Sequence, residues 1–501
     1  MKLIVAISRT NWIQLKSYMN VVIKNIRERH HRCDALILPF CQEDPGVYKS
    51  ISPSTSSLIR KIFRREFSGK LHELLLVPSP EDVKPERILF VGIGKRNEAS
   101  PEKVRQAGGK AASYAQNLGL RNIALSTEVL SSLKISPAIF IEGALLGTYK
   151  FRKYSTENDK KALSHITILS KASSGLLDEV RYVEAVSSSV LFARDLINTP
   201  ANDMTPSHLV RVSHSLRGKN LSVRVIGKRD ASKLGMGAYL SVAKGSEEPP
   251  KFIILHYKGT RKKPLVLIGK SITFDSGGLS LKPAEGMEKM KYDMAGGAAV
   301  LGVFRAVSQL KLPVHLVGIL PATENLPGGS ATKPGDIIHT IGGKTIEILN
   351  TDAEGRMTLA DALGYAKRFS PCAMIDIATL TGACAIALGQ VAIAMMGNDR
   401  ELLDTIRKAG NTTYERVWEM PLFDEYREYI KSDIADLKNT GGRAGSLATS
   451  AYFLKEFAGE IPWVHLDIAG TAWAEKDKPY VPKGAAGIGV RLLTNVIRES
   501  I

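Results

Sequence analysis

The sequence has few cysteines and lacks the common hydrolase motifs. Its four cysteines, Cys33, Cys41, Cys372 and Cys384, form no CxxC pair and are too few to cross-link 501 residues, which excludes a disulfide-rich scaffold and is typical of a reducing cytoplasm. None of the ten histidines belongs to an HExxH motif, and no GxSxG motif occurs. The chain therefore lacks the parts of a zincin and of a serine hydrolase.

The sequence also lacks a long apolar run. The longest one, Ala383–Met396, is interrupted by Gly389 and Gln390 and is shorter than the ~20 residues that cross a bilayer. Near the N-terminus the apolar run Leu3–Ile7 is too short for the core of a signal peptide. We therefore expect a cytoplasmic protein without a membrane partner.

The composition is that of a folded protein with an uneven positive charge. Apolar residues make up 44% and charged residues 24% of the chain, as in ordinary globular proteins, and 501 residues exceed what one core usually organises. Of the 68 Lys and Arg and 50 Asp and Glu, residues 1–175 hold 28 and 15, which leaves 40 and 35 for residues 176–501. A basic N-terminal region can bind nucleic acid or can simply aid solubility.

Alternating apolar strands and helical patterns predict two α/β domains, residues 1–175 and 176–501, with the boundary before a helical pattern at about 177–197. The first domain is expected to contain strands at Ala35–Pro39, Glu73–Val77, Arg87–Ile93, Asn122–Ser126 and His165–Ser170 and helices at Pro101–Leu118 and Pro137–Tyr149. The second is expected to contain strands at Pro264–Ile268, Val314–Leu320, Thr345–Leu349, Ala373–Ala378 and Val464–Ile468 and helices at Ala295–Leu310, Met357–Phe369 and Ala448–Phe457. Nearly continuous apolar strands that alternate with helices favour a mostly parallel sheet flanked by helices.

Acidic and basic residues follow two of these strands and precede one helix. Because ligands of such folds bind beyond the carboxyl ends of the strands, these positions are candidates for a shared site. The residues are Lys270, Asp275, Asp293, Asp352 and Glu354. Each of them alone would be a helix cap, a turn residue or a solvated lysine.

The charges of these residues indicate metal ions. Four carboxylates crowded together repel one another unless cations neutralise them, and two divalent ions match four negative charges. Lys270 would then bind only as a neutral amine, after a metal displaces its proton. Lys282 and Arg356 would remain as positive charges suited to an oxyanion or an anionic base.

Three segments resemble the leucyl aminopeptidase (cytosol aminopeptidase) family of bacterial type. They are IGKSITFDSGGLSLKP at 268–283, MKYDMAGGAA at 290–299 and NTDAEGRMTLADAL at 350–363. The runs NTPAN at 198–202, ATLTG at 378–382 and HLDIAGTAW at 465–473 are similar to the family as well. The resemblance covers residues from about 190 to the end.

The resemblance implies a two-metal peptidase, with Mn²⁺ or Zn²⁺, that removes N-terminal Leu and other apolar residues from peptides. Lys270, Asp275, Asp293 and Glu354 would hold one metal, and Asp275, Asp352 and Glu354 the other. Lys282 would polarise the substrate carbonyl, and Arg356 would hold a bicarbonate that accepts a proton.

The resemblance also implies a substrate pocket and an assembly. The pocket positions are Met290, Asn350, Thr379, Leu380 and Gly382, although Met290 and Thr379 could equally be packing residues. The family forms hexamers whose sites face an internal cavity, and the N-terminal domain would then serve oligomerisation and access. Some bacterial relatives bind DNA, so an additional or sole DNA-binding role through the basic N-terminal domain is the alternative function.

Overall fold

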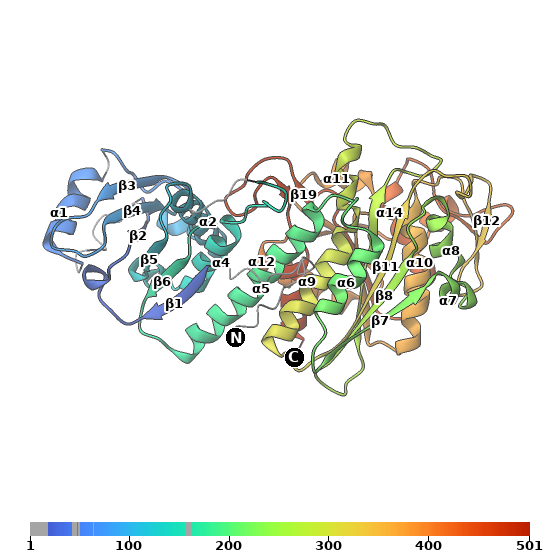
Figure 1. The fold of residues 1–501 in the computed structure, drawn as a ribbon, viewed down its shortest axis with the longest axis horizontal. Helices are drawn as coiled ribbons and strands as arrows, with labels where there is room; N and C mark the ends of the chain where they lie inside the picture. The colour runs from blue at the N-terminus through green and yellow to red at the C-terminus, as the bar shows by residue number, and fades with distance from the viewer. Residues whose placement is uncertain (1–18, 43–47, 49–50, 64, 157–161, 501) are drawn as a thin grey trace, which may run out of the picture.

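The computed structural model of the chain describes residues 19–42, 48, 51–63, 65–156 and 162–500. The apolar run Leu3–Ile7 lies outside the described residues. Two sheets stand at opposite ends of an elongated molecule, and a long helix runs between them (Figure 1). The predicted α/β class is confirmed.

The N-terminal sheet has six strands in the order β1-β6-β5-β2-β4-β3, all parallel to their neighbours except β3. Its strands are β1 (Asn20–Lys24), β2 (Ala35–Phe40), β3 (Leu74–Pro78), β4 (Arg87–Gly92), β5 (Asn122–Ser126) and β6 (His165–Leu169). Its helices are α1 (Pro53–Ile62), α2 (Pro101–Asn117), α3 (Glu128–Ser132) and α4 (Pro137–Gly147). All five predicted strands are present, and β1, α1 and α3 were not predicted.

Helix α5 (Ser174–Asn198) joins the two halves. It begins where the Ser173 side chain accepts a hydrogen bond from the Leu176 amide, and it ends before Pro200, which cannot continue a helix. It packs against α4 of the first half and against α9 (Ala295–Leu310) of the second. The predicted helical pattern at 177–197 lies within it.

The C-terminal sheet has nine strands and is mostly parallel, and its strands β8, β15 and β16 run in the opposite direction to the others. Its order is β16-β15-β18-β14-β9-β11-β8-β7, and β10 pairs with the end of β11. The strands are β7 (Leu221–Gly227), β8 (Lys251–Lys258), β9 (Leu265–Gly269), β10 (Ser271–Asp275), β11 (His315–Asn325), β14 (Ala373–Ala378), β15 (Ile393–Gly397), β16 (Val417–Glu419) and β18 (Trp463–Asp467). Strands β7, β8, β10, β15 and β16 were not predicted.

Helices cover both faces of this sheet, so its central strands are buried on both sides. One apolar cluster packs α5, α9, α12 and α15 on one face, and another packs α8, α10 and α14 on the other. Besides α5 and α9, the helices of this half are α6 (Pro206–Ser215), α7 (Lys228–Lys233), α8 (Gly237–Val242), α10 (Glu354–Ala366), α11 (Gly382–Leu388), α12 (Arg400–Thr413), α13 (Tyr426–Tyr429), α14 (Ser446–Ala458) and α15 (Val490–Glu499). No helix of the described residues is long and apolar enough to cross a membrane.

One predicted strand belongs to a different sheet. The pattern at Thr345–Leu349 forms only β13 (Thr345–Glu347), which pairs with β12 (Ile337–His339) and β17 (Leu437–Lys438) in a small separate sheet. Only Ile346 of β13 is buried, so the segment has too little apolar surface for a central strand of the large sheet. Asp352 and Glu354 therefore reach the site from a loop and a helix start.

Candidate metal centre

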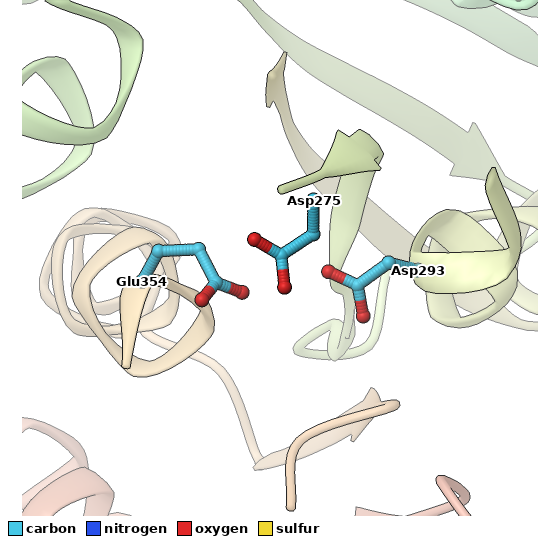
Figure 2. A group of neighbouring side chains, drawn as sticks. All are labelled: Asp275, Asp293 and Glu354. Carbon is cyan, nitrogen blue, oxygen red and sulfur yellow. The ribbon is translucent and has the colours of Figure 1, made fainter. Parts of the chain in front are cut away.

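The predicted ligands converge beyond the carboxyl ends of the central strands. Lys270 follows β9, and Asp275 is the last residue of β10. Asp293 belongs to the 3₁₀ helix η4 (Met287–Met294), and Glu354 is the first residue of α10. Three carboxylates from three elements point toward one another in Figure 2.

These three carboxylates form a compact buried cluster. One oxygen of each of Asp275, Asp293 and Glu354 lies within 4.8 Å of the others, and the residues are only 3%, 5% and 3% exposed. Burial raises the pKa of Asp293, and the neighbouring Asp275 and Glu354 raise it further against the effect of Lys270. Burial and then Asp275 likewise raise the pKa of Glu354. Such a cluster is costly without cations.

Lys270 lies inside the cluster. Its Nζ is 2.8 Å from Asp293 Oδ2 and 2.8 Å from Glu354 Oε1, and it donates a 3.0 Å hydrogen bond to the Thr379 carbonyl. Burial lowers the pKa of Lys270, but the surrounding carboxylates outweigh burial and raise it overall. The amine is thus a cation wherever no other cation neutralises the carboxylates.

Lys282 lies on the other side of Asp275. Its Nζ is 2.9 Å from Asp275 Oδ2 and also pairs with Asp352 Oδ1. Burial lowers the pKa of Lys282, and Asp275, Glu354 and Asp352 together raise it above its ordinary value. The structure therefore brings both predicted lysines and all four predicted carboxylates together.

Glycines of the family-like segments make room for these contacts. A Cβ at Gly355 would lie 2.6 Å from Lys270 Cε, so a side chain there would displace the lysine. Gly277 has a φ of +88°, and a Cβ on it would lie 2.4 Å from the Ser280 carbonyl oxygen and 2.9 Å from Asp352 Oδ1. The motif requires glycine at both positions for close approach of backbone and ligands.

The donor set fits divalent cations. Glu354 Oε2 is buried with neither a hydrogen bond nor an ion pair to any described residue. Asp293 Oδ2 and Asp352 Oδ1 are buried and have a lysine as ion partner but no hydrogen bond. Buried carboxylate oxygens are normally hydrogen-bonded, and hard or borderline divalent ions take such oxygens as ligands.

Arg356 is not in contact with the carboxylates. It is 7% exposed, its Nη1 donates a 2.9 Å hydrogen bond to the Asn439 carbonyl, and its Nε has no hydrogen-bond partner among the described residues. Burial lowers the pKa of Arg356 to about 10, although Glu354 and Asp467 oppose this shift. A buried guanidinium nitrogen without a partner is suited to an anion.

The predicted pocket residues differ in their burial and contacts. Thr379 is buried and its Oγ1 donates a 2.6 Å hydrogen bond to Asp293 Oδ1, whereas Gly382 is exposed at the start of α11. Leu380 and Met290 are partly buried. Asn350 is partly buried as well, and its Oδ1 accepts a 2.9 Å hydrogen bond from the Asp352 amide.

Two asparagines that support the site were not predicted. Asn325 Nδ2 donates to Asp275 Oδ1 at 2.9 Å and to the Thr351 carbonyl at 3.1 Å. Asn439 Nδ2 donates to the Asn350 carbonyl at 2.7 Å. Asn325 lies at the end of the longest strand, a position that could have suggested it, but nothing in the sequence around Asn439 indicates a role.

Known families and relatives agree with this geometry. The chain matches the cytosol aminopeptidase family, N-terminal domain, over residues 48–158 and the catalytic domain of the same family over residues 191–494. It is 44% identical over 490 residues to a probable cytosol aminopeptidase of Geobacter sp. (strain M21), a match that covers 96% of this chain and 100% of the relative. A probable cytosol aminopeptidase of Geotalea uraniireducens (strain Rf4) is 47% identical, with 87% of this chain and 90% of the relative covered.

Solved structures show the same fold. A mutant of tomato leucine aminopeptidase is 33% identical with a TM-score of 0.86, and 96% of each chain is covered. The bottromycin maturation enzyme BotP, in complex with Mn, is 30% identical with a TM-score of 0.82, covering 93% of this chain and 99% of its own. Sequence, fold and buried acidic cluster thus agree: the chain belongs to the cytosol aminopeptidase family and is a metal-dependent exopeptidase.

Proposed function

We propose that the protein is a two-metal aminopeptidase that releases N-terminal residues, preferably Leu and other apolar ones, from peptides. The observation that carries this proposal is the buried cluster of Asp275, Asp293 and Glu354 with Lys270 inside it. Burying several carboxylates together costs free energy, and bound cations would offset this cost.

The ligands of the two metals divide as follows. Lys270, Asp275, Asp293 and Glu354 would hold one ion, and Asp275, Asp352 and Glu354 would hold the other. Glu354 Oε2, which has no partner among the described residues, supports a shared role for this carboxylate. Mn²⁺ and Zn²⁺ are the candidate ions, and the Mn in BotP favours the first. When bound, the two ions supply an acidified water and a Lewis acid for the peptide carbonyl.

Lys270 must release a proton before it can act as a ligand. Its ammonium is held by Asp293 and Glu354, so metal and proton compete for the same nitrogen. The proposal therefore includes proton release on metal binding and tighter binding as the pH rises. Lys282, which is less buried than Lys270, donates a hydrogen bond to the carbonyl oxygen of the substrate and stabilises the oxyanion that develops there.

Arg356 is proposed to hold the proton acceptor, because no histidine is placed as a general base. Its buried Nε lacks a partner among the described residues, which supports an anion such as bicarbonate at this position. When held by Arg356, such an anion would supply a base for a proton of the attacking water. Met290, Asn350, Thr379, Leu380 and Gly382 form the proposed binding site for the first residue of the peptide.

The proposed assembly is a cytoplasmic homohexamer of two-domain subunits. Residues 1–175 form the domain that serves oligomerisation and access, and residues 176–501 form the catalytic domain. Support comes from Ile386, Trp418 and Phe423, which are 85%, 63% and 64% exposed. Trp418 lies on the edge strand β16, and exposed apolar edges of this kind are commonly covered by another subunit.

Hydrolysis of Leu-p-nitroanilide tests the proposed activity. The purified protein is assayed before and after chelation, and then after separate addition of Mn²⁺ and Zn²⁺. We expect activity to be lost on chelation and restored by at least one ion. Activity that survives complete removal of the metal would contradict the proposal.

DNA binding through residues 1–175 is the second candidate function, and it rests on their 28 Lys and Arg against 15 Asp and Glu. Sequence-tolerant binding to duplex DNA that weakens steeply with salt would support it. No binding at low salt would end it. The peptidase assay is independent of this result.

A further inference from the structure

Two of the family-like segments contact each other, and the proposed mechanism does not use this contact. They are the runs at 378–382 and 465–473, which begin within the neighbouring parallel strands β14 and β18 and continue past their ends, with Ala378 opposite Asp467. The two runs therefore meet at the carboxyl edge of the sheet, beside the metal centre. Their contacts point to one residue, Asp467.

Asp467 is fully buried and binds the chain that leaves β14. Its Oδ1 accepts hydrogen bonds from the amides of Leu380 (3.1 Å) and Ala469 (3.0 Å). Its Oδ2 accepts from the amide of Thr381 (3.0 Å) and from Thr381 Oγ1 (2.7 Å). Both carboxylate oxygens are thus used to hold the loop at 379–382.

The same loop contacts the metal centre on its other side. The Thr379 carbonyl accepts a 3.0 Å hydrogen bond from Lys270 Nζ, and Thr379 Oγ1 donates a 2.6 Å bond to Asp293 Oδ1. Asp293 Oδ2 has Lys270 as an ion partner but no hydrogen bond to any described residue. A neutral Lys270 amine that donates to this carbonyl keeps its lone pair for a metal. Thr379 therefore orients one proposed metal-binding atom on each of two ligands, Lys270 Nζ and Asp293 Oδ2, and these two atoms pair with each other in the structure.

A second buried pair holds β18 in place below Asp467. His465 Nδ1 lies 2.5 Å from Asp376 Oδ1, and Asp376 Oδ2 accepts a 2.7 Å hydrogen bond from Trp463 Nε1. Trp463, His465 and Asp467 alternate along β18 and share one face. These bonds from Asp376 on β14 to β18 fix the two strands against each other. The loop at 379–382 follows β14, and Asp467 is the last residue of β18.

We infer that Asp467 is a positioning residue for the half of the metal centre formed by Lys270 and Asp293, acting through Thr379 and Thr381. The inference rests on the proposed two-metal function, because it concerns affinity for one of the two ions. Asp467 touches neither ligand, so its effect passes through the backbone of the loop. The expected consequence is selective: one metal site weakens and the other does not.

Titration of Mn²⁺ into the metal-free, full-length protein by calorimetry tests this selectivity. In Asp467→Asn one carboxylate oxygen becomes an amide that cannot accept the bonds from the loop, and we expect a ~10–100-fold weaker affinity at one site, as for other supports of metal ligands. The affinity of the second site is expected to remain that of the wild type.

Asp361→Asn is the matched control. Asp361 is also fully buried and also accepts backbone hydrogen bonds, from Tyr239 (2.8 Å) and Ile341 (2.8 Å), but these segments hold none of the proposed ligands. We expect this variant to unfold at a lower urea concentration with both metal affinities unchanged. Thr381→Val, which loses one bond to Asp467, is expected to follow Asp467→Asn to a smaller extent, and Thr381→Ser to bind like the wild type.

Wild-type affinities at both sites in a folded Asp467→Asn variant would overturn the inference, as would equal weakening of both sites. If Asp467→Asn fails to fold, the comparison of Thr381→Val with Thr381→Ser decides between selective weakening and none. If the wild-type protein binds fewer than two ions, the proposed two-metal function is refuted. If it binds two ions but the variants weaken neither site selectively, only the inference about Asp467 is refuted.

Discussion

Buried charges in the two halves of the molecule are neutralised in opposite ways. Near the N-terminal sheet, Glu142 accepts hydrogen bonds from Arg105 Nε (2.7 Å) and from Arg491 Nη1 (2.9 Å), so both of its oxygens are paired. In the catalytic half, Glu354 Oε2 has no partner among the described residues, and Asp293 Oδ2 has an ion pair with Lys270 but no hydrogen bond. All three carboxylates are buried. Both oxygens of Glu142 have hydrogen-bond donors, whereas, within the described part of the chain, the carboxylates of the metal centre lack donors for some of their oxygens.

The pKa directions express the same difference. Burial opposes ionisation of Glu142, yet Arg105 and Arg491 lower its pKa to about 2. Burial raises the pKa of Asp293, and the nearby carboxylates add to the increase. A completed network stabilises the fold, whereas an incomplete one indicates a ligand that supplies the missing charge. Five changes separate these two roles.

The largest effect is expected from Asp275→Asn. This carboxylate is proposed to bind both metals, and because even outer supports of a ligand cost ~10–100-fold each, we expect kcat/KM to fall roughly 1000-fold. Hydrolysis of Leu-p-nitroanilide at saturating Mn²⁺ measures the change. Asp433→Asn, at an exposed aspartate, serves as the control, and equal activities of the two variants would remove Asp275 from the site.

Glu142→Ala should reduce stability and spare the metal centre. The change removes one of two buried acidic partners from each of Arg105 and Arg491, which keep Glu102 and Glu415, so we expect a loss of about 3 kcal/mol of unfolding free energy, the lower end for breaking a buried pair. Urea unfolding measures this loss, with the exposed Glu81→Ala as a control. A loss of Mn²⁺ affinity in folded Glu142→Ala would show that the two networks are coupled.

Arg356→Ala should show the reverse pattern. Because it removes the proposed holder of the proton acceptor, we expect turnover to fall by about 100-fold, the lower range of general base catalysis, with metal content retained. Arg105→Ala is the matched comparison, since its guanidinium is paired with Glu102 and Glu142 and its loss should affect stability instead. Unchanged turnover in Arg356→Ala would count against its role.

Asp293→Asn distinguishes the two networks without a substrate. In the metal-free protein it removes a crowded charge, so we expect the free energy of unfolding to change by less than about 1 kcal/mol or to rise. With Mn²⁺ at 100 times its Kd the wild type should gain about 2.7 kcal/mol, and the variant should gain less. Strong destabilisation of the metal-free variant would mean that Asp293 is a structural residue like Glu142.

The smallest effect near neutral pH is the acid sensitivity of Glu142. Because folding lowers its pKa from 4.5 to about 2, its contribution to stability is complete above the higher value and is lost as the pH falls through the lower one. Urea midpoints between about pH 6 and about pH 3 should therefore fall less steeply for Glu142→Gln than for the wild type. Parallel pH profiles would show that Glu142 does not titrate in this range.

Much of the fold was predictable because its strands are continuous apolar segments between helices. Ala373–Ala378 was predicted at its observed bounds, as was the helix Ala295–Leu310. Strand Thr345–Leu349 was predicted too long and belongs to another sheet, because a short apolar pattern does not specify its partner. Strand β8 was missed, although five of its eight residues are buried.

The sequence by itself determined the family, the α/β class and the identity of the acidic and basic residues of the centre, since these follow from local patterns and motifs. Only the tertiary structure decided the contacts of these residues. It leaves Glu354 Oε2 without a partner among the described residues, bonds Lys270 to the Thr379 carbonyl, and bonds Asp467 to the loop that carries Thr379. Hydrogen bonds between residues as distant as Thr379 and Asp293 depend on how strands and helices pack. Spacing along the chain carries no record of that packing.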